Sequence, residues 1–77
     1  MDEAVITILS EVLQIPRERI TDELAMRDTE FWDSLKHMEL IGSLEQQFNL
    51  QLSFEEIVTM RSVSEIKRVL RQKTAEN

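Results

Sequence analysis

Apolar side chains recur at helical spacing in several stretches of this chain, and only one glycine and one proline interrupt them. In the first stretch, from Asp2 to Gln14, aliphatic residues fall on one face of a helix and acids occupy its first turn. Pro16 follows, and the residue before a proline is disfavoured in the α conformation, so Ile15 should already be extended. Such periodicity predicts amphipathic helices that bury their apolar faces against one another.

Three further helices are expected downstream. With about 100° per residue, Leu40, Leu44 and Phe48 share one face of a second helix. Two S-x-x-E sequences, starting at Ser53 and Ser62, match the capping box, in which serine and glutamate side chains bind the first backbone amides of a helix. The expected helices cover residues 2–14, 34–48, 54–58 and 63–73. The predicted fold is therefore an all-α four-helix bundle with a short third helix.

The length of 77 residues suits one small domain, because a chain of this size buries only about 60% of its unfolded surface and has no material for a second core. A hydrophobic content of 42% is typical of globular proteins and too high for a disordered chain. We therefore expect residues 1–77 to form a single domain.

The segment between the first two expected helices, residues 16–33, shows no helical or strand period. Its apolar residues are scattered among charges, which predicts a long ordered loop held to the core at a few points. Loops of this length are uncommon in small domains and often carry function. This loop leads directly to Asp33, Ser34 and Leu35 at the start of the second helix, so these residues are the first candidates for a functional site.

The charge of the chain is strongly negative and unevenly distributed. The formal net charge is −6; residues 1–33 carry nine acids and three bases, whereas residues 61–77 carry two acids and five bases. Nucleic-acid binding requires clustered Lys and Arg, so a nucleic-acid partner is not expected. A cationic partner would meet the first two thirds of the chain.

The chain contains no cysteine, which excludes disulfides and thiolate metal sites and means that it has no thiol of its own. The single histidine and the scattered loop acids do not form a recognisable metal site, so none is expected. No stretch approaches the run of about 20 apolar residues that a membrane span requires, and the start Met1-Asp2-Glu3 lacks the positive charge of a secretory signal. We therefore expect a cytoplasmic protein.

Several motifs of the chain resemble those of the acyl carrier protein family, which includes peptidyl carriers. They are, in chain order, Asp33-Ser34-Leu35, Glu39-Leu40, Leu44-Glu45-Gln46-Gln47-Phe48 and Ser62-Val63. The likeness covers nearly the whole chain in length, helix order and position of the serine at the mouth of the second helix. It implies a four-helix fold of acyl carrier type and a carrier on which partner enzymes act, rather than an enzyme.

The resemblance implies that Ser34 receives 4′-phosphopantetheine from coenzyme A through a separate Mg²⁺-dependent phosphopantetheinyl transferase, and that the thiol of this arm bears the acyl group. The residues agree, because a phosphodiester at Ser34 would lie at the positive end of the second helix and the arm would supply the missing thiol. Without the surrounding motifs, Ser34 would be interpreted as an N-cap. Asp33 could cap the helix, help to hold the transferase's Mg²⁺, or both.

Leu35, Met38 and Glu39 are predicted to form a surface that partner enzymes contact. On the helical wheel Leu35 lies opposite the core face and Met38 lies to one side of it, so the core does not use either side chain. The alternative is that both pack beneath the long loop. Acyl-loading and acyl-transfer enzymes are the expected partners, and the carrier itself is expected to be a monomer.

Trp32 and His37 flank Ser34, and each has more than one possible role. Trp32 could contact a partner or shield the arm, although an anchor that holds the loop to the core is the favoured interpretation. His37 could activate the Ser34 hydroxyl in a small hydrolase. We favour a hydrogen-bonding role beneath the loop, because the wheel turns His37 toward the core and no carboxylate is placed to orient its ring.

The chain departs from the commoner fatty-acid carrier pattern around the motif. Phe31-Trp32 replaces a glycine-containing approach, Lys36 replaces an acid, and Gln46-Gln47 replaces acids late in the second helix. Since charge complementarity selects partners, these changes and the contact residue Lys36 favour a different set of partner enzymes. We expect a specialised stand-alone carrier in a lipid or polyketide-like pathway. Two alternatives stay open: an aminoacyl or peptidyl carrier of non-ribosomal-peptide type, and an unmodified helical interaction module.

Overall fold

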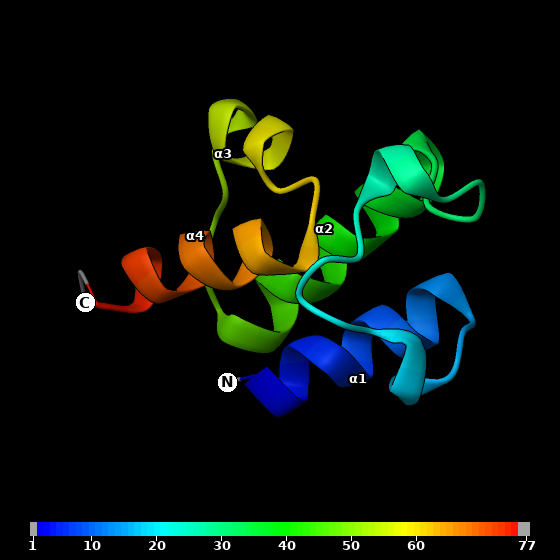
Figure 1. The fold of residues 1–77 in the computed structure, drawn as a ribbon. Helices are drawn as coiled ribbons and strands as arrows, with labels where there is room; N and C mark the ends of the chain where they lie inside the picture. The colour runs from blue at the N-terminus through cyan, green and yellow to red at the C-terminus, as the bar shows by residue number, and fades with distance from the viewer. Residues whose placement is uncertain (1, 76–77) are drawn as a thin grey trace.

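Four α-helices form the framework of the computed structural model, which describes residues 2–75 (Figure 1). They are α1 (Asp2–Leu13), α2 (Ser34–Phe48), α3 (Phe54–Thr59) and α4 (Val63–Ala75). In Figure 1, α1 and α3 lie on opposite sides of the molecule, with α2 and α4 between them. The predicted all-α fold is confirmed, and the described residues contain no strand beyond an isolated bridge between Ala25 and Ser62. No helix in residues 2–75 is long and apolar enough to cross a membrane.

The ends of α1 and α2 show how local backbone conformation stops a helix. Gln14 adopts the left-handed conformation with a φ of 59°, so α1 ends one residue earlier than predicted. The amide of Ile15 then donates a hydrogen bond back into the last turn at 3.3 Å. Asn49 repeats this arrangement after α2, with a φ of 52° and a hydrogen bond of 3.1 Å from the amide of Leu50. Both ends satisfy carbonyls that the helix itself leaves free.

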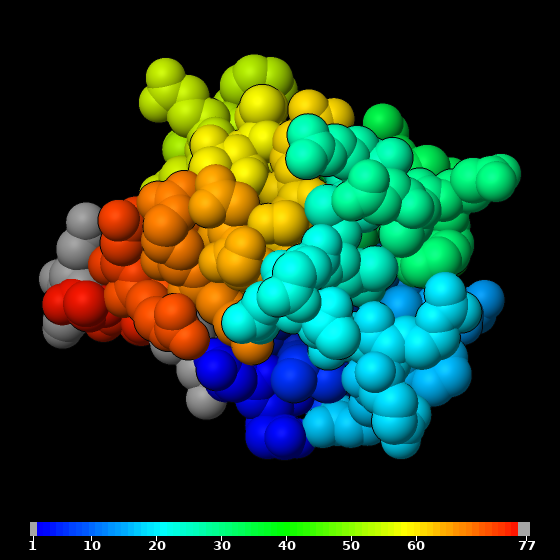
Figure 2. Space-filling model, viewed as in Figure 1, coloured from blue at the N-terminus to red at the C-terminus, as the bar shows by residue number. Residues whose placement is uncertain are grey.

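The long loop between α1 and α2 contains two short 3₁₀ turns that the sequence did not predict, η1 (Arg17–Arg19) and η2 (Met26–Asp28). Between them the chain crosses the face of the molecule shown in Figure 2 and lies beside the start of α4, where the amide of Ser64 donates a hydrogen bond of 3.2 Å to the carbonyl of Asp22. The amide of Met26 donates a hydrogen bond of 2.9 Å to the carbonyl of Arg61, in the connection between α3 and α4. The loop is therefore ordered by main-chain pairing with a segment distant in sequence.

The core consists of one face each of α1, α2 and α4, together with side chains from the connections. Its buried apolar members are Val5, Ile8, Leu9, Leu13, Ile20, Trp32, Leu40, Ile41, Leu44, Leu52, Met60, Val63, Ile66, Val69 and Leu70. The predicted helix faces are confirmed, although Val12 and Phe48 are only half-buried at their edges. Leu52 and Met60 come from the connections on either side of α3, where no helical period marks them.

Helix α3 begins with the capping box that its sequence predicts. Glu56 accepts a hydrogen bond of 2.8 Å from Ser53 N–H, and Ser53 Oγ accepts one of 3.1 Å from Glu56 N–H. The backbone hydrogen bond from Ser53 lowers the pKa of Glu56, so its stabilising contribution is present above pH 4.5 and is lost as the pH falls through the lower folded value. In the second box only Ser62 participates, because the Glu65 carboxylate binds Arg68.

The cations of α4 pair with acids elsewhere in the chain. Lys67 lies 2.7 Å from the carboxylate of Asp22 and 3.8 Å from that of Asp2. Arg71 lies 3.4 Å from the same Asp2 side chain. Exposed pairs of this kind contribute about 0–1 kcal/mol each, so their main consequence is the placement of charge. These pairs bring cations of the basic C-terminal helix to two acids of the N-terminal part of the chain.

Candidate functional site

Ser34 is the first residue of α2, and Asp33 precedes it as the N-cap. Asp33 has an extended backbone, and its carboxylate accepts a hydrogen bond of 2.9 Å from Lys36 N–H. The interpretation of Ser34 as the cap is therefore wrong, because Asp33 holds that position. Ser34 is exposed, and within the described part of the chain no hydrogen bond holds its hydroxyl. That hydroxyl is accessible to an external reagent.

The start of α2 suits an anion attached to Ser34. The first amides of a helix have no partner within it, and its dipole stabilises a nearby anion by about 0.3–1 kcal/mol. The Asp33 carboxylate accepts a hydrogen bond from the amide of Lys36, and within residues 2–75 the amides of Ser34 and Leu35 remain available to an anion. The helix has 15 residues, so several aligned turns contribute to the dipole. A phosphodiester on the Ser34 oxygen fits this environment.

Trp32 and His37 form a buried clamp beneath the candidate site. The indole nitrogen of Trp32 lies 3.1 Å from His37 Nδ1, and His37 Nε2 lies 3.0 Å from the carbonyl oxygen of Ile57. An indole N–H is a donor only, so His37 Nδ1 is the acceptor. The ring proton is thereby assigned to Nε2, which donates to Ile57. Neutral His37 therefore joins the end of the long loop to α2 and to α3.

This clamp decides the roles of both residues. Trp32 is 1% exposed, so its possible role as a partner contact is wrong, and the favoured interpretation as a loop anchor is confirmed. A tryptophan that fills the core cannot also offer its ring to another protein. Both nitrogens of His37 are occupied, which leaves none to accept the Ser34 proton. The hydrogen-bonding role of His37 is confirmed, and it extends to α3 as well as to the loop.

Apolar side chains remain exposed on both sides of Ser34. Leu35 is 72% exposed and Met38 is 57% exposed, which excludes packing of either side chain beneath the loop. Phe54 and Val58 of α3 are also exposed, at 79% and 46%, and the sequence did not single them out. Since α3 has six residues, it is too short to show a helical period that would separate its faces. The exposed apolar surface therefore spans two helices.

A groove of about 310 Å³ lies beside Ser34 and runs between α2 and α3. Its lining consists of Met26, Ser34, His37, Met38, Phe54, Ile57, Val58 and Arg61. Most of these side chains are apolar, and Arg61 contributes the positive charge of the lining. Binding pockets for small molecules share this composition of apolar walls with a few polar groups. The groove was not predicted, because it forms between segments separated in sequence.

Lys36 and Glu39 lie one turn apart on α2, away from the groove that Met38 lines. Their charged groups form an ion pair of 3.6 Å, three residues apart along the helix. The lysine that distinguishes this chain from the commoner pattern thus has part of its charge neutralised locally. In the part of the chain that the structure describes, no three acidic or histidine side chains gather into a metal site.

Comparison with known proteins identifies the class to which this fold and site belong. The sequence model of the family described as "Phosphopantetheine attachment site" matches residues 3–70. The chain belongs to the acyl carrier protein family. It is therefore a carrier rather than an enzyme, and 4′-phosphopantetheine is its covalently bound prosthetic group.

Two relatives agree with this membership. An "Acyl carrier protein homolog" of Mycoplasmopsis pulmonis (strain UAB CTIP) is 28% identical over 67 residues, which cover 87% of this chain and 90% of that protein. A solved structure from Mycobacterium tuberculosis, described as an acyl carrier protein, superposes with a TM-score of 0.82 at 27% identity. That match covers 91% of this chain and 93% of the other. The predicted acyl carrier topology is confirmed.

Proposed function

We propose that Ser34 is the residue that carries the prosthetic group. In the attachment reaction the Ser34 oxygen would attack the pantetheine-bearing phosphorus of coenzyme A. A new bond forms between this oxygen and that phosphorus. The bond from the same phosphorus to the oxygen that bridges the two phosphorus atoms breaks, and adenosine 3′,5′-bisphosphate leaves with the bridging oxygen. The hydroxyl proton passes to a base of the transferase. The observation that carries the proposal is the Ser34 hydroxyl, which is exposed at the start of α2 directly after the N-cap Asp33 and makes no hydrogen bond within residues 2–75.

The arm would give this protein the thiol that its sequence lacks, and the acyl group would be held on it as a thioester. We infer that residues 1–77 act as one monomeric carrier domain that presents this thioester to acyl-loading and acyl-transfer enzymes. The exposed apolar residues on both sides of Ser34 support this role, because they offer partners an apolar contact next to the attachment point. Transport of the acyl group, rather than chemistry on it, is the proposed function.

The mass of the protein isolated from its native host tests this proposal. We expect an increase that corresponds to one phosphopantetheine plus its cargo, and the cargo mass separates an acyl carrier from an aminoacyl or peptidyl carrier. A protein that is found only at the mass of the unmodified chain, with an active transferase present in the same cells, would instead support the unmodified interaction module.

We further propose a specialised lipid or polyketide-like pathway. The support is the exposed face of α2, where Lys36 and the exposed pair Gln46 and Gln47 replace acids that would steer a basic partner. The pathway proposal is tested by the rate at which a standard fatty-acid synthase acyltransferase transfers an acyl group to the free thiol of the arm on this carrier. We expect slow transfer, and a rate equal to that of the fatty-acid carrier would contradict the pathway proposal.

Met38→Ala is expected to slow acyl transfer by about 3- to 10-fold, because truncation of a central apolar contact at an interface removes about 1 kcal/mol or more of binding energy. The free energy of unfolding should change by less than about 0.5 kcal/mol, since the side chain is exposed. Met60→Ala is the matched control, because Met60 is fully buried and its truncation should lower stability by about 2–5 kcal/mol. A large loss of stability in Met38→Ala with unchanged transfer would place Met38 in a structural role.

A further inference from the structure

Two arginines near the groove have no acidic partner among residues 2–75. Every cation of α4 pairs with an acid; these cations are Lys67, Arg68, Arg71 and Lys73. Arg17 pairs with Glu3, and Arg19 lies over the ring of Phe31. Arg27 and Arg61 make neither kind of contact within the described residues.

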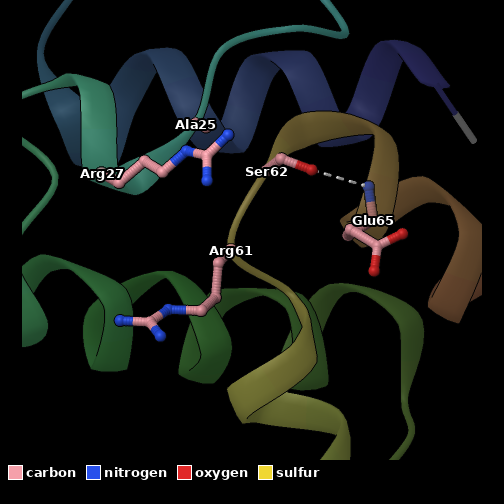
Figure 3. Close-up of a pocket in the computed structure, with 5 residues that line it drawn as sticks. All are labelled: Ala25, Arg27, Arg61, Ser62 and Glu65. Carbon is pink, nitrogen blue, oxygen red and sulfur yellow. Dashed lines mark hydrogen bonds between the residues drawn. The ribbon is translucent and has the colours of Figure 1, made fainter.

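Both arginines line a second hollow that adjoins the groove. This hollow has a volume of about 380 Å³, and Ala25, Ser62 and Glu65 complete its lining. Arg61 belongs to the linings of both spaces, so it stands at the boundary between the groove beside Ser34 and the hollow beside Arg27. Figure 3 shows the Arg27 side chain extending toward Ser62 and the Arg61 side chain extending across α2.

The backbone holds the two arginine-bearing segments together. The Met26 amide, next to Arg27 in sequence, donates a hydrogen bond of 2.9 Å to the Arg61 carbonyl. The antiparallel bridge between Ala25 and Ser62 joins the same two segments. Their relative position is therefore set by main-chain hydrogen bonds, whereas the guanidinium groups stay exposed and adjustable.

Glu65, the acid in the hollow, already has its own counter-ion. Its two carboxylate oxygens accept hydrogen bonds of 3.1 and 3.2 Å from Arg68, and these bonds lower the pKa of Glu65. The negative charge of Glu65 is therefore paired with Arg68 on α4. Arg27 supplies positive charge to this hollow, whereas Figure 3 shows the Arg61 side chain extending away from Ser62 and Glu65, so that Arg61 is the positive charge of the groove beside Ser34.

We propose that Arg61 binds the free carboxylate of a dicarboxylic acyl group carried on the arm, with Arg27 in the adjoining hollow as a second positive charge, an inference that rests on the proposed attachment at Ser34. Such a cargo has an apolar stem that fits the walls contributed by Met38, Ile57 and Val58, and an anionic tip that fits a guanidinium. The phosphodiester of the arm is the competing anion, because Ser34 and Arg61 line the same groove. It brings no apolar stem to the walls formed by Met38, Ile57 and Val58, whereas a dicarboxylic acyl group does.

The test loads three arms onto the protein with a phosphopantetheinyl transferase. They are the unacylated arm, a pentanoyl arm and a glutaryl arm labelled with carbon-13 at its free carboxyl group. The intact mass reports the loading before any other measurement. A chain that accepts no arm refutes the proposed function itself, which separates that failure from a failure of the present inference.

Nuclear magnetic resonance then follows the labelled carboxyl as the pH is lowered. We expect its pKa on the wild-type carrier to lie about half a pH unit or more below that of glutaryl-coenzyme A, because a nearby guanidinium favours the ionised form even when partly exposed to water. Arg61→Gln should restore the free value, and Arg27→Gln should restore part of it. Arg19→Gln removes an arginine outside both spaces and should leave the pKa lowered.

Two results would overturn the inference. The first is a carboxyl that titrates identically on the wild-type carrier and on glutaryl-coenzyme A. The second is an Arg61 side-chain resonance that moves equally with the unacylated, pentanoyl and glutaryl arms, which would assign Arg61 to the phosphodiester. Movement confined to the glutaryl form supports the carboxylate site.

Discussion

Ser34→Ala is expected to abolish phosphopantetheine attachment, so that incubation with coenzyme A and a transferase produces no gain in mass. The reason is chemical, because the methyl group of alanine has no oxygen to form the phosphodiester. The free energy of unfolding should change by less than about 0.5 kcal/mol, since the Ser34 side chain is exposed and Asp33 performs the capping. The attachment defect would therefore appear in a normally folded protein.

Ser43→Ala is the matched control for this experiment. Ser43 lies in the middle of the same helix, in a shallow hollow between α1 and α2 and away from the groove. We expect it to accept one arm at the wild-type rate. Mass gain in Ser34→Ala, or its absence in Ser43→Ala, would move the attachment point elsewhere in the chain.

Trp32→Ala is expected to lower the free energy of unfolding by about 3–5 kcal/mol. The substitution leaves a large cavity in the core and removes the indole N–H that donates a hydrogen bond to His37 Nδ1. A domain of this size has a total stability of only about 4–12 kcal/mol. Much of the variant should therefore be unfolded or easily unfolded in urea. Circular dichroism at increasing urea concentration measures this loss.

Two comparison variants separate the contributions of Trp32. Trp32→Phe keeps most of the buried ring but leaves His37 Nδ1 without its donor, so it should cost about 1–3 kcal/mol. Phe54→Ala truncates an aromatic residue that is exposed, and it should leave stability almost unchanged. Wild-type stability in Trp32→Ala would show that the clamp does not hold the loop.

The clamp also explains why the candidate site has a defined position. Trp32 lies two residues before Ser34, and His37 lies one turn after it. Trp32 donates a hydrogen bond to His37, and His37 donates one to the carbonyl of Ile57. These hydrogen bonds fix the end of the loop, the first turn of α2 and one wall of the groove. We expect the loop to tolerate substitution at its exposed residues far better than at Trp32.

Local sequence predicted most of the fold because short-range signals control helices. The observed start of α2 agrees with the predicted one because Asp33 is a strong N-cap, and α3 begins where its capping box indicated. The end of α1 differed by one residue, since the left-handed conformation of Gln14 depends on the turn that follows. The two 3₁₀ turns were missed because they have no period, and tertiary pairing with Arg61 orders one of them.

The sequence by itself determined the helices, the absence of a thiol and the exposed serine motif at the start of α2, because each depends on residues close together in the chain. Only the tertiary structure decided that Trp32 is buried, that His37 is committed to two hydrogen bonds, and that a groove runs from Ser34 to Arg61. These features require contacts between the long loop, α2 and α3. Such contacts form when the helices pack, and a pattern along one helix does not specify them.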